Sequence, residues 1–269
     1  MIKIRPFLKW AGSKYNCLDK IIPFLPAGQR LIEPFAGSGV IFMNTAYSSY
    51  LLAESNLDLV HLFTYLQQEG DEFIEQCRSY FTPEFNCKEK YYPFRSEFNQ
   101  APYTSQRAAL FLYLNRHGYN GLCRYNSQGI YNVPFGLYTR PYFPYKEMQL
   151  FHEKCQSTQF IHQDFRKTFE QAERGDVIYC DPPYVPLSEK TKLLPYNQKL
   201  FTTEDQIELT ELAKETAAKG IPVILSNHDT EFTRYHYSKA KIKSFPVSRY
   251  INCRTDLRRP VKELLAIFS

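Results

Sequence analysis

Val177-Ile178-Tyr179-Cys180-Asp181-Pro182-Pro183-Tyr184 is an apolar run that ends in an acid, two prolines and an aromatic residue. The apolar part predicts a buried strand, and because a proline cannot donate to a strand ladder, the strand must stop at Asp181. In an open α/β sheet, ligands bind beyond the carboxyl ends of the strands, where residues 181–184 would lie. The stretch therefore predicts an α/β sheet with a ligand site at this strand end.

The last four residues of this stretch carry groups that suit a planar ligand with an exocyclic NH2. Asp181 offers carboxylate acceptors, the carbonyl of Pro182 has no neighbouring N–H to satisfy it, and Tyr184 offers a flat aromatic face. Taken alone, however, the tetrapeptide is more simply a solvated turn with a packing tyrosine. A second match elsewhere in the chain is therefore needed.

The second match is a glycine turn in residues 31–42, where the pattern predicts a short strand, the turn and a helix start. The G-x-G spacing lets the backbone approach a ligand, and the helix N-terminus presents free N–H groups to a carboxylate or phosphate. A second strand ends in the acid Glu54, 15 residues past Gly39. An acid there accepts hydrogen bonds from ribose hydroxyls, which predicts a nucleoside cofactor. Phe42 replaces the third glycine of the dinucleotide pattern, which argues against a dinucleotide.

Three further polar positions stay open on the sequence alone. Trp10, the only tryptophan, lies between two lysines beside a Gly-Ser turn, and by itself is better explained as a core anchor. Asp164 follows a predicted strand and could accept from the adenine amine of a cofactor or cap a helix. His228 beside Asp229 is compatible with acid–base chemistry, but a turn at the end of strand 221–225 is the simpler interpretation.

The stretch from Gly118 to Gly136 is punctuated by glycines, alternates Tyr, Asn and Arg, and predicts a loop and β-hairpin. It lies within residues 101–145, which hold four arginines and no acid. Arg binds guanine bidentately, Asn binds adenine, and aromatic residues stack or wedge, so this stretch is the strongest candidate for reading bases. The alternative is a surface hairpin with mutually packed tyrosines.

A second acid-poor stretch, 234–262, has nine Lys or Arg and one acid, Asp256, which favours a polyanion-binding surface.

Length and composition limit the class of protein and its domain organisation. A chain of 269 residues can bury a full α/β core, as one large domain or one domain with an insertion. No run of about 18 apolar residues occurs and the N-terminus lacks a signal-peptide core, so we expect an intracellular protein without a membrane segment. The seven cysteines are scattered and form no C-x-x-C pair, which predicts reduced thiols and neither zinc nor disulfides.

In order and spacing, these motifs resemble the Dam family of DNA adenine-N6 methyltransferases, over almost the whole chain from Phe7 to Phe268. Each motif alone is weak, and their combination is highly specific. Cofactor motif first, recognition region next and catalytic tetrapeptide last is the order of the α group of amino-methyltransferases. The matching stretches are Phe7 to Lys14 (cofactor motif), Glu33 to Gly39 (glycine motif), Asn115 to Gly136 (recognition hairpin), Asp181 to Tyr184 (catalytic tetrapeptide), Ser226 to Thr230 and Glu263 to Leu265.

The resemblance implies a Rossmann-like methyltransferase sheet with helices on both faces, formed by residues 1–56 and 146–269. Residues 57–145 would be an inserted helical and β-hairpin domain that recognises the DNA target. The cofactor would be S-adenosylmethionine, and the substrate the adenine of GATC in double-stranded DNA, methylated at N6 after base flipping and without a metal. We expect a monomeric, cytoplasmic, nucleoid-associated enzyme.

Carried over by position, the resemblance also implies three groups of site residues. The flipped base would be held by Asp181, Pro182 and Tyr184. The cofactor would contact Trp10, Lys14, Phe35, Gly37, Gly39, Glu54, Asp164 and Asp181. The recognition site would be read by, or packed on, Lys9, Asn120, Leu122, Arg124, Pro134 and Tyr138, with Tyr119 as a wedge in the duplex.

Two stretches depart from the family's pattern. Glu54 stands where Asp is usual, and because both are carboxylates we expect an altered reach and retained function. Residues 252–257 lack the glycine-rich loop that is common before the last strand.

Three functions are alternatives to a GATC adenine methyltransferase. They are a methylase of a restriction–modification system with another target sequence, an N4-cytosine enzyme, and a non-catalytic DNA-binding protein on a methyltransferase fold. The intact tetrapeptide and glycine motif argue against the last.

Overall fold

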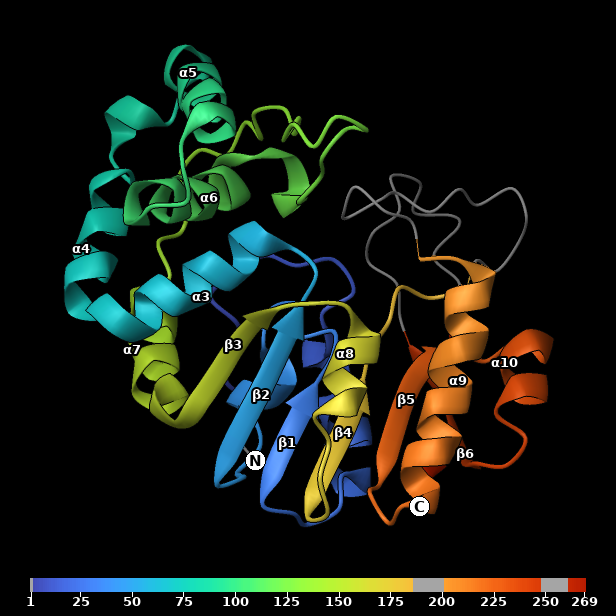
Figure 1. Ribbon diagram of the computed structural model, residues 1–269. Coiled ribbons are helices and arrows are strands. Elements are labelled where there is room, and N and C mark those ends of the chain that lie inside the picture. Colours follow the sequence, from blue (N-terminus) through green and yellow to red (C-terminus); the bar gives the residue numbers. More distant parts are fainter. Residues whose placement is uncertain (1, 186–200, 248–260) are drawn as a thin grey trace.

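The computed structural model describes residues 2–185, 201–247 and 261–269, which form a seven-stranded mixed sheet (Figure 1). In spatial order the strands are β3 (Thr158–His162), β2 (Ser49–Glu54), β1 (Arg30–Glu33), β4 (Asp176–Cys180), β5 (Val223–His228), β7 (Val261–Phe268) and β6 (Lys241–Val247). The first five run parallel, and β7 is antiparallel to both of its neighbours. The last strand in the sequence, β7, is therefore antiparallel, and β6 forms the edge of the sheet.

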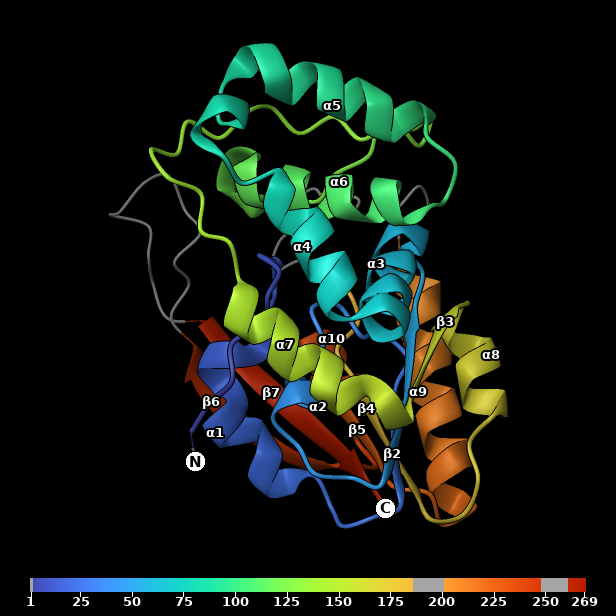
Figure 2. The same ribbon diagram turned by 90° about the vertical axis from the view of Figure 1, so that its left-hand side faces the viewer.

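Helices cover both faces of the sheet, because its central strands are apolar on both sides (Figure 2). In β4, Val177 and Tyr179 point into one core and Ile178 and Cys180 into the other. The first core is covered by α1 (Leu18–Ile21), α2 (Val40–Met43), α3 (Leu57–Glu69) and α7 (Tyr145–Lys154). The second is covered by α8 (Phe165–Glu170) and α9 (Thr203–Ala218), and α10 (Glu231–His236) follows β5. The predicted Rossmann-like class is confirmed.

A layer of helices lies beyond the carboxyl ends of the parallel strands (Figure 1). It consists of α4 (Asp71–Ser79), α5 (Lys88–Gln100) and α6 (Ser105–His117). Every residue of α6 from Ala108 to His117 is buried, which is the pattern of a helix surrounded on all sides. Because α3 packs against both β3 and α6, it joins this layer to the sheet. The boundary of an inserted domain at residue 57 stays a prediction.

The segment from Gly118 to Gly136, here called the reading segment, differs from the predicted regular hairpin. Its only β-pairs among the described residues are two isolated bridges, Gly118 with Phe135 and Tyr125 with Tyr131. A short 3-10 turn, Tyr119–Gly121, opens it, and Asn120 in that turn has a φ of 53°. A residue with positive φ cannot continue a strand, so the ladder is interrupted at its start.

The strand order reverses between β1 and β4. From β1 the chain passes outward through β2 to β3, then returns to the other side of β1 at β4. Ligands of open α/β sheets bind in the crevice at such a reversal, outside the carboxyl ends of the strands. Asp181 follows β4 directly, so the fold places the predicted catalytic turn at this point. Among the described residues, no helix has the length and apolar character needed to span a bilayer.

Candidate active site and nucleic-acid interface

Asp181 meets a buried lysine at the end of β4. The ammonium Nζ of Lys14 lies 3.1 Å from Oδ1 of Asp181, and the two side chains are 6% and 21% exposed. Apart from this ion pair, Oδ1 of Asp181 has no hydrogen-bond partner in the described part of the chain. Burial raises the pKa of Asp181 to about 6, an effect that Lys14 opposes and the negative charge of Glu263 reinforces. Asp181 is therefore ionised at neutral pH and retains acceptor capacity.

Side chains from three parts of the chain hold the ring of Tyr184. Its hydroxyl lies 2.6 Å from Oγ of Ser226 and donates to Oε2 of Glu263 at 3.1 Å. The Lys14 ammonium lies 4.4 Å from the ring centroid, within cation–π range. The ring of His228 approaches edge-on, with the centroids 4.7 Å apart. The tyrosine is thus oriented before any ligand binds.

The backbone after Tyr184 is fixed by α9 and β5. Gln206 of α9 donates to the carbonyl of Pro183 at 2.6 Å, and the backbone N–H of Val185 donates to Asn227 at 3.3 Å. Nδ1 of His228 lies 2.8 Å from the carbonyl oxygen of Val185. The predicted turn at His228 is wrong, because β5 continues to this residue, where it pairs with Glu263 of β7. Gln206 was missed, since nothing in its local sequence marks it.

The glycine turn and the end of β2 are joined by one carboxylate. Oε2 of Glu54 accepts the N–H of Gly37 at 3.0 Å, and Oε1 accepts the N–H groups of Ser55 and Asn56 at 2.9 and 3.1 Å. Burial raises the pKa of Glu54, and these hydrogen bonds oppose the rise. A Cβ at Gly37 would lie 3.1 Å from the indole nitrogen of Trp10, and the φ of Gly37 is +49°. The structure thus brings Trp10, the turn and Glu54 together.

Glu33, at the end of β1, is a site feature that sequence reasoning did not single out. Its side chain is buried, and Oε1 has no hydrogen-bond partner among the described residues. Desolvation raises its pKa to about 8, and the charge of Asp181 adds to the rise. A buried acceptor without a partner is costly, so it suits a ligand that brings a cationic donor. The only sequence signal was its place at the start of the glycine motif.

Two of the other predicted cofactor residues, Phe35 and Asp164, lie beside α8. The ring of Phe35 stacks on Phe165 with centroids 5.5 Å apart. Asp164 caps α8 by accepting the N–H of Arg166 at 3.0 Å, and it also pairs with that guanidinium. Its geometry is therefore that of a helix cap, and the cofactor contact stays a prediction. Gly39, with a φ of +67°, is the N-cap residue of α2.

Lys9 lies beside the reading segment and is fixed to α6. Asn115 accepts the N–H of Lys9 at 2.9 Å and donates to its carbonyl at 2.7 Å. The Lys9 ammonium lies 3.8 Å from the ring centroid of Tyr138. Burial, with a smaller contribution from Arg116, lowers the pKa of Lys9 to about 8. A Cβ at Gly121 would collide with the Lys9 side chain, so a glycine is required beside Asn120.

The guanidinium of Arg124 is held along one edge by Asn132. Its Nε donates to Oδ1 of Asn132 at 2.7 Å, and its Nη2 donates to the Asn132 carbonyl at 3.2 Å. The role of Arg124 in reading a base stays a prediction. The remaining predicted residues lie along the same segment: Tyr119 is 45% exposed, its N–H donates to Pro134, and Leu122 accepts from Tyr131.

Part of the predicted surface lies outside the described residues. Four of the nine basic residues of the stretch 234–262 fall there, as does the 252–257 departure; the four are Arg249, Arg254, Arg258 and Arg259. The cysteines that the structure describes are all free thiols, as predicted. No group of three or more His, Cys, Asp or Glu suited to a metal occurs in residues 2–185, 201–247 or 261–269.

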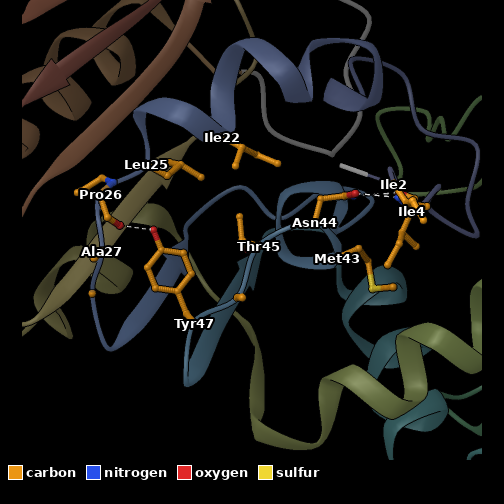
Figure 3. A pocket seen from close by; sticks show the side chains of 12 residues that line it. Ile2, Ile4, Ile22, Leu25, Pro26, Ala27, Met43, Asn44, Thr45 and Tyr47 are labelled. Carbon is orange, nitrogen blue, oxygen red and sulfur yellow. Dashed lines mark hydrogen bonds between the residues drawn. The ribbon is translucent and has the colours of Figure 1, made fainter.

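Figure 3 shows a cavity of about 530 Å³. It lies at the amino ends of β1 and β2, whereas Asp181 follows the carboxyl end of β4. Its wall includes Gly28 and Tyr47, which precede β1 and β2. Its polar groups are satisfied within the chain, since Asn44 accepts the N–H of Ile4 at 2.8 Å and the Tyr47 hydroxyl donates to Pro26 at 2.6 Å. None of the predicted site residues lines it. The polar cluster at the β1/β4 reversal is therefore the better candidate site.

Comparison with known proteins identifies the family. The sequence pattern of D12 class N6 adenine-specific DNA methyltransferases matches residues 10–250. The chain is 47% identical over 269 residues to the DNA adenine methylase of Escherichia coli K12, which covers all of this chain and 97% of that protein. It is 45% identical to that of Serratia marcescens, with full coverage of both chains, and 44% identical to that of Vibrio cholerae, with 98% of that protein covered. The chain therefore belongs to the D12 class of N6 adenine-specific DNA methyltransferases, within the DNA adenine methylase (Dam) family.

Proposed function

We propose that this DNA adenine methyltransferase transfers the methyl group of S-adenosylmethionine to N6 of the adenine in GATC, in double-stranded DNA, with the adenine flipped out of the helix. The observation that carries the proposal is the cluster at the β1/β4 reversal, where the acceptor Asp181 adjoins the oriented ring of Tyr184. Asp181 would accept a hydrogen bond from the adenine amine, and Tyr184 would offer a stacking surface. Acting as a monomer in the cytoplasm, close to the nucleoid, is part of the same proposal.

The residues at the strand ends fit S-adenosylmethionine chemically. The cofactor has an ammonium, a ribose diol, an adenine ring and a sulfonium that supplies an electrophilic methyl group. The unpartnered Oε1 of buried Glu33 suits the ammonium, and Glu54 suits the diol. Trp10 and Phe35 offer aromatic surface on either side of the glycine turn. Because Glu54 already accepts three backbone N–H groups, it would hold both the turn and the ribose.

Asp181 and Pro182 would prepare the adenine amine for attack. The N6 lone pair is delocalised into the ring, so N6 is a poor nucleophile while its hydrogens stay in the ring plane. The Asp181 carboxylate and the Pro182 carbonyl would accept these two hydrogens and favour a tetrahedral amine. The negative charge of Asp181 would stabilise the positive charge that builds on N6, a preorganised electrostatic effect. Tyr184 would stack on the base, whose extraction from the duplex costs a few kcal/mol.

Target reading would belong to residues 57–145, the proposed recognition domain. Arg124 would read a guanine with its Nη1/Nη2 edge, while Asn120, Leu122, Pro134 and Tyr138 would read or pack on the other bases. The exposed Tyr119 would fill the space left by the flipped base. Lys9 would contribute a positive charge at the same surface.

The test is methylation of a random-sequence duplex library with labelled S-adenosylmethionine, followed by sequencing of the modified positions. We expect label on adenine N6 within GATC. Label at another adenine motif would favour a restriction–modification methylase, and label on cytosine would overturn the proposed chemistry. Absence of both label and cofactor binding, the latter measured by calorimetry, would indicate a non-catalytic DNA-binding protein.

A further inference from the structure

A buried carboxylate connects the reading segment to the helix that follows Glu54. Asp58, in the first turn of α3, is 7% exposed and has a donor at each oxygen. Its Oδ1 accepts from Nε of Arg107 at 2.7 Å, and its Oδ2 accepts from the hydroxyl of Tyr125 at 2.7 Å. Hydrogen bonds to a charged, buried acceptor are among the stronger ones in proteins, so Asp58 joins α3, α6 and the reading segment firmly.

The residues on both sides of Arg124 are anchored at the start of α3. Tyr125 bonds Asp58, and the thiol of Cys123 lies 3.5 Å from the side-chain nitrogen of Asn56, the N-cap residue of α3. Both Cys123 and Tyr125 are buried. Among the described residues the segment has only two isolated bridges, so these side chains, together with the bonds between Arg124 and Asn132, hold Arg124 in place.

The anchor is itself rigid. Arg107 bonds Asp58 and also donates to the carbonyls of Phe98 and Ala101 at 2.6 and 2.7 Å, at the end of α5. Asn56 and Asp58 begin the helix two residues after Glu54, whose carboxylate holds the glycine turn. The position of Arg124 is thereby fixed relative to the strand ends where the chemistry takes place.

We propose that Asp58, through Tyr125, is a positioning residue for target discrimination: it holds Arg124 at the depth and angle needed to reach its base. This inference rests on the proposed base-reading role of Arg124. Asp58 and Tyr125 are buried and need not touch DNA themselves. Their effect on target discrimination would therefore pass through Arg124.

The test uses Tyr125→Phe, which removes one hydroxyl and leaves the Asp58–Arg107 pair intact. The matched control is Tyr113→Phe, which removes the hydroxyl of a buried tyrosine in α6 that bonds the carbonyl of Phe85 at 2.6 Å and not Asp58. The measurement is kcat/KM on GATC duplexes and on duplexes with the guanine pair replaced. Tyr125→Phe should lower the ratio between them about tenfold, the size expected for one lost bond to a charged group, and Tyr113→Phe should leave it unchanged.

A double-mutant cycle distinguishes an effect on the position of Arg124 from a general loss of structure in the recognition region. In an Arg124→Ala background, Tyr125→Phe should cause no further loss of discrimination at the guanine pair, because the residue through which it acts is gone. Asp58→Asn, which keeps the size of the side chain, is the second variant if Tyr125→Phe does not fold, and it should lower the same ratio. The kcat at saturating GATC and cofactor should stay near the wild-type value in both variants.

Three outcomes would contradict the positioning role of Asp58, and a fourth would contradict the proposed target specificity. Full wild-type discrimination in folded Tyr125→Phe, an equal loss in Tyr113→Phe, or an additive loss in the double mutant would overturn the positioning role. If the wild-type enzyme methylated the replaced duplexes as fast as GATC, the proposed target specificity would itself be overturned, and this inference with it.

Discussion

The turn after β4 and the reading segment are built in opposite ways. The turn follows a strand whose five residues are all buried, between two parallel neighbours, and Gln206 and Asn227 hold its backbone. The reading segment has two isolated bridges and is held by side chains. The proposed catalytic groups thus lie at the ends of regular strands, while the proposed base-reading groups lie on a segment without regular strands that side chains hold in place. We therefore expect methylation rate and target selectivity to respond to different substitutions.

The largest expected effect is on the strand-end side of this comparison. Asp181→Ala should lower the methylation rate at least 10²-fold, because removing a preorganised group from a charge-developing site costs about 2.7–4 kcal/mol. DNA affinity should change far less, since phosphate contacts supply most of it. The measurement is a single-turnover rate together with a DNA-binding titration. Asp19→Ala, at an exposed carboxylate paired with Lys3, is the control.

A rate in Asp181→Ala above about a tenth of the wild-type value would contradict this prediction, since it corresponds to a barrier change under about 1.4 kcal/mol. Another hydrogen-bond acceptor at the strand ends would then have the catalytic role.

A second prediction concerns the cofactor end of the same rigid region. Glu54→Ala should weaken S-adenosylmethionine binding by about 1.5–3 kcal/mol for each charge-assisted hydrogen bond lost. Part of the effect would come from the glycine turn, because Glu54 also holds the N–H of Gly37. Glu54→Asp, the residue usual in the family, should retain activity. Calorimetric titration with cofactor checks both, and unchanged affinity in Glu54→Ala would remove this residue from the site.

The pH dependence of the rate gives a third, smaller effect. Because burial raises the pKa of Asp181 to about 6, the carboxylate is ionised above that pH and protonated below it. We expect kcat/KM to fall about tenfold per pH unit as the pH drops below 6, and to level off between pH 6 and the range in which Lys9 titrates. A pH–rate profile on a GATC duplex measures this. A rate that stayed constant between pH 7 and pH 5 would show that the reaction does not need ionised Asp181.

The smallest expected effect belongs to the reading side. Burial lowers the pKa of Lys9 to about 8, so its ammonium is charged below that pH and neutral above it. DNA affinity should therefore fall severalfold as the pH rises from 7 to 9, because a cation near phosphates is lost. Lys9→Arg stays charged throughout this range and should flatten the profile. Equal pH dependence in wild type and Lys9→Arg would assign the titration to another group.

The strand-end region was largely predictable because its signals are local. The prolines after Asp181 end a strand, and an acid after the second strand identifies Glu54. What could not be predicted are pairings between distant residues: Gln206 reaches the turn from 23 positions away, and Lys14 reaches Asp181 from the N-terminal segment. The reading segment was predicted as too regular, because the positive φ of Asn120 and the Asp58–Tyr125 anchor leave no local sequence pattern.

If chemistry and target reading reside in separate regions of the molecule, one variant from each region should change only one of the two. Methylation rates of Asp181→Asn and Arg124→Ala would be measured on GATC and each single-base variant, at saturating duplex and at two salt concentrations. Asp181→Asn should lose rate on every duplex while keeping wild-type discrimination. Arg124→Ala should lose about 1–3 kcal/mol of discrimination at one base pair and little rate on GATC. Relaxed discrimination in Asp181→Asn, or a uniform loss with a weaker salt dependence in Arg124→Ala, would contradict the account.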